Sequence, residues 1–157
     1  MKEQEYAQRV QGLKHRLYRT ARLYLAGDAA ALDAVDEAVY RGFLHHRKLR
    51  RPEYFDTWLT RILINVCNDE LRRRKREQTV DELPETGAQD YDALPLRDAV
   101  ERLPRELRAV IVLRYFSGYT LAETAEILKI PAGTVSSRQR RALELLRLEL
   151  SDEEGGT

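Results

Sequence analysis

The sequence is short of several residue types, and each shortage excludes a class of protein. It contains one cysteine, Cys67, so an intramolecular disulfide framework is impossible and a reducing, cytoplasmic location is expected. The longest apolar run, Ala109 to Leu113, is far shorter than the roughly 20 residues that span a bilayer, and the charged start contains no signal segment. With only 8 glycines, 5 prolines and apolar residues mostly at helical spacing, we expect a soluble all-α protein without membrane insertion of its own.

The net charge of +1 conceals two basic blocks. Lys and Arg exceed Asp and Glu by 7 in residues 1–76 and by 3 in residues 99–150, whereas residues 77–98 have a net charge of −6. Two basic blocks favour two polyanion-binding domains. The chain is accordingly divided into domains at 1–77 and 96–150, a flexible acidic linker at 78–95 and a disordered tail at 151–157.

Three helices are expected in the first domain. Over about residues 3–26, steps of four and three predict a helix that buries one stripe: Tyr6, Val10, Leu13, Leu17, Ala21 and Tyr24. A second helix, about 29–46, is expected to carry Leu32, Val35, Val39, Phe43 and Leu44. After a basic connector, Pro52 can serve as the first residue of the third helix. Its apolar positions are Phe55, Trp58, Leu59, Ile62, Leu63 and Val66, with Trp58 expected in the core rather than as a base-stacking residue.

The third helix ends in five consecutive cations: Arg72, Arg73, Arg74, Lys75 and Arg76. Cations at a helix C-terminus are favoured by the helix dipole, so a solvated helix end is one interpretation. Five in succession exceed what such a helix end needs, which favours contact with phosphates.

The second domain is expected to contain four helices. One begins near Pro95 with Leu96, Ala99, Val100 and Leu103 inward, and another carries Leu107, Val110, Ile111 and Leu113 to about Phe116. Thr120 and Glu123 then have the spacing of a capping box, which predicts a helix start at Thr120. The pattern stops before Pro131, which can open the last helix.

The two last helices have the pattern of a helix-turn-helix. A helical wheel places Val135, Ala142, Leu146 and Leu150 on one side, and Gly133, Ser137, Arg140, Arg141 and Glu144 on the other. In a helix-turn-helix the second helix enters the major groove, where arginine can bond guanine O6 and N7 together. Arg140 and Arg141 are therefore candidates for base contacts, and Ser137 for a base edge or a phosphate. The alternative is a helical hairpin whose arginines are merely solvated.

Two other classes of protein stay open. An ordinary helix-turn-helix regulator with a helical dimerisation domain would bind a palindromic operator as a dimer. A helical metal-dependent hydrolase would have to use His15, His45, His46, Asp33 and Asp36, but adjacent histidines point to different sides of a helix and no HExxH spacing occurs. We expect no enzyme, no metal site and no cofactor.

The stretches FDTWLTRILINVCNDELRRRKR and LPRELRAVIVLRYFSGYTLAETAEILKIPAGTVSSRQRRA resemble bacterial RNA polymerase sigma factors of the extracytoplasmic-function group. The resemblance extends from about Tyr6 to Leu150. It implies two helical domains: region 2, a three-helix bundle, and region 4, a four-helix domain with the helix-turn-helix, joined by a flexible linker. It also implies a transcription initiation factor that binds core RNA polymerase and promoter DNA and is held inactive by an anti-sigma factor.

The resemblance implies roles by position. Residues 133–141 match the helix that binds the minus-thirty-five element, with Ser137, Arg140 and Arg141 toward bases and Arg138 toward phosphate. Residues 46–54 match the loop that captures a flipped base of the minus-ten element; Lys48, Arg50, Arg51 and Tyr54 are the candidates, since single strands are held by cations and stacking aromatics.

The second helix matches the element that grips the clamp of the polymerase's largest subunit. Asp33 and Asp36 match the acidic positions and Phe43 the aromatic one, whereas Val39 and Tyr40 stand where Gln and Glu are usual. The resemblance thus implies core polymerase contacts at Asp33, Asp36 and Phe43.

Overall fold

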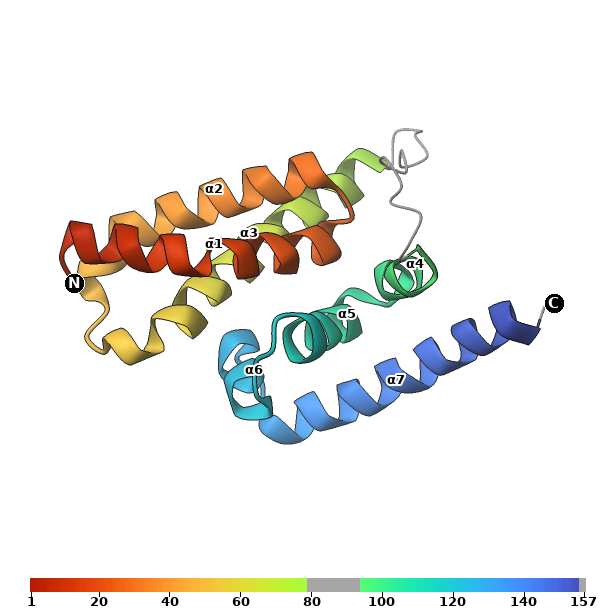
Figure 1. Ribbon diagram of the computed structural model, residues 1–157. Helices are drawn as coiled ribbons and strands as arrows, with labels where there is room; N and C mark the ends of the chain where they lie inside the picture. The colour runs from red at the N-terminus through yellow and green to blue at the C-terminus, as the bar shows by residue number, and fades with distance from the viewer. Residues whose placement is uncertain (79–93, 156–157) are drawn as a thin grey trace. The chain divides into compact units, whose positions relative to one another are not determined.

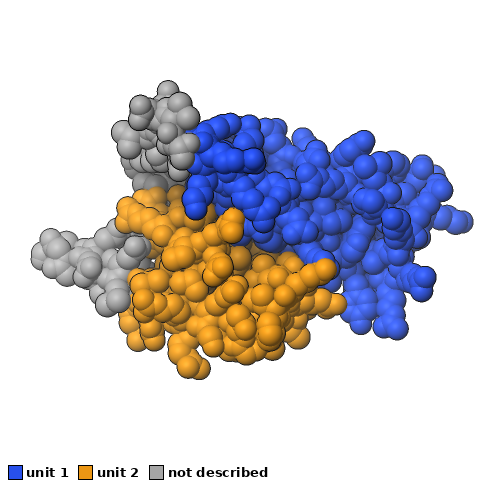
Figure 2. Space-filling model, turned by 180° about the vertical axis from the view of Figure 1, so that it is seen from behind, with its two compact units in different colours: residues 1–86 blue, residues 87–157 orange. Residues whose placement is uncertain are grey.

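The computed structural model describes residues 1–78 and 94–155 of the chain, and the described part is all-α (Figure 1). The chain divides into two compact units, residues 1–86 and 87–157, coloured separately in Figure 2. Each unit has its own hydrophobic core. The all-α prediction with two helical domains is confirmed, and the predicted acidic linker falls largely on residues 79–93, outside the described part.

The first unit is a bundle of three long helices, α1 (Glu3–Leu25), α2 (Asp28–His45) and α3 (Phe55–Gln78). All three pairs of helices are in contact, and Figure 1 shows α1 and α2 side by side. The α1–α2 turn is tight because Ala26 adopts the left-handed conformation with φ of 55° and donates its N–H to the Arg22 carbonyl. Two short 3₁₀ turns, η1 (His46–Lys48) and η2 (Pro52–Tyr54), lie between α2 and α3.

The predicted stripe of α1 is confirmed as the core of this bundle, since every residue from Tyr6 to Tyr24 in it is buried. Tyr6 also makes a polar contact, because its hydroxyl donates to the Val39 carbonyl of α2 at 2.6 Å. Burial raises the pKa of Tyr6 to about 12, so the hydroxyl keeps the proton that it donates.

The apolar residues that spacing identified on α2 do not form its buried face. Leu32, Phe43 and Leu44 are exposed and Val39 is half-buried, and only Val35 of this set is buried. The face in contact with α1 and α3 is instead made of small residues at helical spacing: Ala31, Ala34, Ala38 and Gly42, with Val35. Small side chains let the neighbouring helices approach closely, and the large apolar side chains are left outside.

The third helix follows the predicted pattern, with Phe55, Leu59, Leu63 and Val66 buried and Trp58 and Ile62 half-buried. Trp58 lies 6.0 Å from the Phe55 ring, between the core and the surface. Pro52 does not begin α3. It opens the 3₁₀ turn η2, and the α-helix starts at Phe55.

The second unit contains α4 (Leu94–Arg102), α5 (Arg105–Ile111), a π-helical turn η4 (Val112–Phe116), α6 (Leu121–Leu128) and α7 (Ala132–Gly155). Helix α7 packs against α4, α5 and α6, so it is the central helix of the unit (Figure 1). Ala99, Val100 and Leu103 are buried as predicted, but Leu96 is 42% exposed at the start of α4. The prediction ended the last helix at Leu150, whereas α7 continues to Gly155.

Among the described residues, no helix is long and apolar enough to cross a bilayer.

We predict that Gly42→Ala destabilises the first unit. An added Cβ would lie 2.5 Å from the Tyr6 hydroxyl oxygen and 2.8 Å from Leu59 Cδ1, so the buried contact would have to shift. Overpacking of this kind costs about 1–3 kcal/mol, more than the roughly 1 kcal/mol by which alanine improves helix propensity. Trp58 is the only tryptophan, so its fluorescence during urea unfolding reports on this unit alone.

Gly12→Ala in α1 is the matched control, because nothing lies within 4 Å of its added Cβ. It should leave the urea midpoint unchanged or raise it. Equal urea midpoints for the two variants would mean that the close contact of Tyr6 and Leu59 with Gly42 does not exclude a side chain at that position.

Candidate nucleic-acid interfaces

The turn between α6 and α7 is fixed by local hydrogen bonds. The Thr120 hydroxyl accepts the Glu123 N–H at 3.1 Å and the Glu123 carboxylate accepts the Thr120 N–H at 2.9 Å, which confirms the predicted capping box. Helix α6 ends at Leu128. The next residue, Lys129, has a left-handed conformation (φ 56°) that turns the chain toward Pro131. The Pro131 carbonyl then accepts the N–H of Val135 at 3.1 Å, which opens α7. The segment is a helix-turn-helix.

Helix α7 presents the two faces predicted for it. Val135, Ala142 and Leu146 are buried against the unit; Leu150 lies among residues whose side chains are not described. The opposite face is exposed at each of Gly133, Ser137, Arg140, Arg141 and Glu144. Two adjacent guanidinium groups therefore project from the N-terminal half of the second helix.

The polar side chains near this face make only weak contacts with their neighbours. Ser137 donates to the Gly133 carbonyl at 3.0 Å, a bond that an exposed hydroxyl can exchange for another acceptor. Arg141 lies 3.5 Å from Glu144, and both side chains are more than half exposed. Arg138 is on the flank, 3.8 Å from Glu106 of α5. Exposed ion pairs contribute little to stability, so these cations are available to a ligand.

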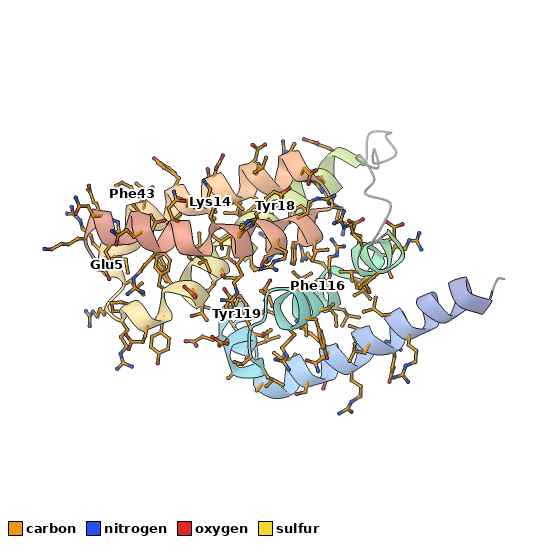
Figure 3. The ribbon with its side chains drawn as sticks, in the orientation of Figure 1. Glu5, Lys14, Tyr18, Phe43, Phe116 and Tyr119 are labelled. Atoms are coloured by element: carbon orange, nitrogen blue, oxygen red, sulfur yellow. The ribbon has the colours of Figure 1, made fainter. Side chains whose placement is uncertain are left out.

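Two residues missed by sequence reasoning set the position of α7. Arg114 of η4 donates to the Gln139 side chain at 3.0 Å and to the Tyr119 carbonyl at 2.9 Å. Tyr119, labelled in Figure 3, is buried just before the cap of α6. One guanidinium thus ties η4, the start of α6 and the second helix together, and Gln139 is turned inward. In the sequence, Arg114 is only an arginine within an apolar run, and helical spacing alone does not predict its hydrogen-bond partners.

The connector, residues 46–54, gathers a second set of predicted side chains. Lys48, Arg50, Arg51 and Tyr54 are all exposed. The Tyr54 N–H donates to the Arg51 carbonyl at 3.0 Å, so η2 closes the connector with the Tyr54 ring on the surface. Cations beside an exposed aromatic ring are the arrangement that holds a single nucleic-acid strand.

The basic run at the end of α3 is not uniform. Arg72, Arg73, Lys75 and Arg76 are exposed, but Arg74 is half-buried. Arg74 donates to the Leu25 carbonyl at the end of α1 at 2.7 Å and to Glu70 at 3.2 Å. A hydrogen bond from Arg73 is the main cause of the lowered pKa of Glu70, so Glu70 stays ionised beside both arginines. Arg74 therefore serves the fold, whereas the other four cations face solvent.

The outer face of α2 combines acids with large apolar side chains. Asp33, Asp36 and Phe43 are exposed, as are Leu32, Tyr40 and Leu44. Phe43 lies near the C-terminal end of α2 (Figure 3). Phe43 also stacks on buried His46 at 5.1 Å, whereas the other large apolar side chains of this face lie outside the core, which makes the face a candidate surface for a protein partner.

The residues considered for a metal site do not come together. His46 is buried, with its Nδ1 against the Phe43 carbonyl at 2.5 Å, whereas His15 and His45 are exposed on different helices. Cys67 is fully buried, and burial raises the pKa of its thiol to about 12. Within residues 1–78 and 94–155, no three His, Cys, Asp or Glu side chains are placed to hold a metal ion.

The comparisons with known proteins agree with this division. A family model described as Sigma-70 region 2 matches residues 10–77, and one described as Sigma-70, region 4 matches residues 99–148. The chain is 32% identical to RNA polymerase sigma factor SigV of Bacillus subtilis, over 90% of this chain and 88% of that protein. It is 30% identical to ECF RNA polymerase sigma factor SigW of the same organism, over 88% and 85%. The chain belongs to the extracytoplasmic-function group of the sigma-70 family.

The fold of this sigma factor recurs in solved structures. Sigma factor RpoE from Bartonella quintana, solved with the anti-sigma factor NepR, is similar with a TM-score of 0.80 and 22% identity, over 94% of this chain and 97% of that one. CnrH, solved with the cytosolic domain of CnrY, gives a TM-score of 0.75 at 22% identity, over 96% and 90%. As a sigma factor of this group, the protein acts in promoter-specific transcription initiation by RNA polymerase.

We predict that Arg74→Ala lowers the stability of the region 2 unit by about 1–3 kcal/mol, since the Leu25 carbonyl and Glu70 lose a charged partner. Arg72→Ala is the matched control, because its exposed pair with Asp69 at 3.2 Å contributes little. Urea unfolding followed by Trp58 fluorescence measures both variants. Indistinguishable midpoints would show that Arg74 has no special part in the fold.

Proposed function

We propose that this sigma factor directs core RNA polymerase to promoters with two separated elements and traps the melted minus-ten strand. In this proposal residues 1–77 bind core polymerase and the minus-ten element, and residues 96–150 bind the minus-thirty-five element. No bond is made or broken by the chain; binding energy alone drives strand opening. The observation that carries the proposal is the presence of one exposed cationic surface in each unit, on the helix-turn-helix and on the connector.

The minus-thirty-five contact is assigned to the exposed face of α7. Ser137, Arg140 and Arg141 are directed at base edges, and Arg138 on the flank at a phosphate. Bidentate arginine contacts to guanine are the commonest specific contact in the major groove. Gly133 lies at the start of α7. Because it has no side chain, the helix backbone can approach the duplex closely there.

The minus-ten contact is assigned to the connector. A base flipped out of the duplex would stack on Tyr54, which is 43% exposed, while Lys48, Arg50 and Arg51 hold the strand by its phosphates. Arg72, Arg73, Lys75 and Arg76, exposed at the other end of α3, are assigned to phosphates. Arg74 is omitted from this surface because its guanidinium is engaged by Leu25 and Glu70.

The polymerase contact is assigned to the outer face of α2, through Asp33, Asp36 and Phe43. This face is exposed although it holds large apolar side chains, which supports a protein partner. An anti-sigma factor is proposed as a further partner, supported by the solved structures of RpoE with the anti-sigma factor NepR and of CnrH with the cytosolic domain of CnrY.

The test is in-vitro transcription from a promoter library with both elements randomised, using bacterial core polymerase with and without the full chain. We expect starts that depend on the protein and share two separated motifs. A triple variant, K48A with R50A and R51A, should keep core binding and the minus-thirty-five motif but lose strand opening, measured by permanganate reactivity of unpaired thymines.

Palindromic duplex binding by a dimer, with no core binding and no transcription, would favour an ordinary helix-turn-helix regulator instead.

We predict that Arg141→Ala weakens recognition of one base pair in the minus-thirty-five motif by about 1–3 kcal/mol, since a bidentate contact is lost. Sequencing of transcripts from the library gives the preference at each position. Arg147→Ala is the matched control, an exposed arginine further along α7. An unchanged preference in R141A would remove Arg141 from the base-reading set.

A further inference from the structure

The connector that carries Lys48, Arg50, Arg51 and Tyr54 has few internal hydrogen bonds to hold its shape. Of its described backbone bonds outside the regular helices, one joins the Leu49 N–H to the His46 carbonyl at 3.3 Å and one closes η2. Its cations are exposed, so they do not fix it from within. The connector must therefore be held from outside to present its side chains in one arrangement.

The outside support is the first turns of α1, which Figure 1 shows beside the connector. Glu3, Tyr6 and Arg9 recur at intervals of three and lie along one side of that helix. Glu3 pairs with Arg47 at 3.8 Å, and the Tyr6 ring lies 5.3 Å from the His46 ring. The exposed Glu3–Arg47 pair contributes little, so the ring contact with buried His46 is what holds the beginning of the connector.

Arg9 and Thr57 hold the other end of the connector, where the Thr57 hydroxyl of α3 donates to the Tyr54 carbonyl at 3.1 Å. The Arg9 Nη1 donates to the Pro52 carbonyl at 2.8 Å, between Arg51 and Tyr54 in the chain. The Pro52 carbonyl also accepts the Phe55 N–H, so it marks the junction between η2 and α3. No other side chain is recorded as donating to this carbonyl in the described part of the chain.

The guanidinium of Arg9 is itself held in place. Glu5, labelled in Figure 3, accepts its Nε at 3.3 Å and lies 3.2 Å from its Nη2. The group also stands over the Phe55 ring, 5.8 Å from the centroid. A planar fork with several donors can hold Glu5 and Pro52 together, which a single ammonium does less well.

We propose that Arg9 is a positioning residue for minus-ten recognition: by fixing the Pro52 carbonyl, it sets how the connector presents Arg51 and Tyr54 to the unpaired strand. Arg9 touches no DNA in this proposal. The inference rests on the proposed minus-ten role of the connector, and it adds a specificity determinant that lies about forty residues earlier in the chain.

The test compares Arg9→Met with Arg16→Met in holoenzyme made from the full chain and core polymerase. Methionine keeps an unbranched apolar side chain at this position but removes the donors and the cation that stands over Phe55. Arg16 is the matched control, since it also lies on α1 and pairs with α3, 3.7 Å from Asp56. Both variants lose one positive charge, so the difference between them is not a charge effect.

The readouts are core affinity, permanganate reactivity at the minus-ten element, and discrimination between single-stranded oligonucleotides with matched and altered minus-ten sequences. We expect R9M to bind core within about twofold of wild type but to discriminate about tenfold less well, the factor expected from one lost charged hydrogen bond. Arg9→Lys should recover part of the discrimination, because an ammonium can still donate to Pro52. R16M should match wild type in all three readouts.

Equal discrimination by R9M and R16M would overturn the inference, and so would a parallel loss of core affinity and discrimination in both Arg9 variants. If R9M proves too unstable, R9K and Glu5→Gln take its place. R9K replaces the guanidinium by a single ammonium donor, and Glu5→Gln keeps the guanidinium but weakens the group that holds it. Each should discriminate less well than wild type, and wild-type discrimination in both would overturn the inference. Failure of the wild-type protein to open any promoter would instead refute the proposed function.

Discussion

The region 2 bundle depends on the absence of a side chain at Gly42. Because α2 is bare at that position, the Tyr6 hydroxyl can pass over it and donate to the Val39 carbonyl at 2.6 Å. The Tyr6 ring is then placed near His46 at 5.3 Å and Phe55 at 5.8 Å. One aromatic ring therefore joins α1, the end of α2 and the start of α3, at the end of the bundle where the connector emerges.

In the region 4 unit, one polar side chain joins three elements in the way that the Tyr6 ring does in region 2. Arg114 bonds both Gln139 and the Tyr119 carbonyl, so the orientation of the second helix follows from a single half-buried guanidinium. The capping box at Thr120 fixes the helix before it. Apart from half-buried Arg138, the side chains assigned to DNA in both units are exposed and carry little of the fold, while a buried or half-buried neighbour determines where they stand.

The sequence predicted the elements whose signals are local. Helical spacing located the α1 stripe, and Thr120 with Glu123 located the start of α6. The wheel of α7 separated buried Val135 from exposed Arg140 correctly, because that helix has one apolar side and one polar side. Family resemblance supplied the order of the domains and their roles.

What the sequence did not predict depends on contacts between distant residues. On α2 the large side chains suggested the wrong inner face, since alanine and glycine pack inside only if α1 and α3 approach closely. Arg74 was indistinguishable from its basic neighbours until the Leu25 carbonyl, 49 residues away in the chain, was placed beside it. Arg9 and Arg114 gave no signal for the same reason.

The composition of α2 also gives its two faces different tolerance of substitution. Its inward positions are nearly all alanine or glycine, so a larger side chain there would force α2 away from α1 and α3. Leu32, Tyr40 and Leu44 are exposed, so changes at these positions leave the packing of the bundle intact. Phe43 belongs to both faces, because it is 41% exposed while its ring stacks on buried His46 and lies 6.0 Å from Tyr6.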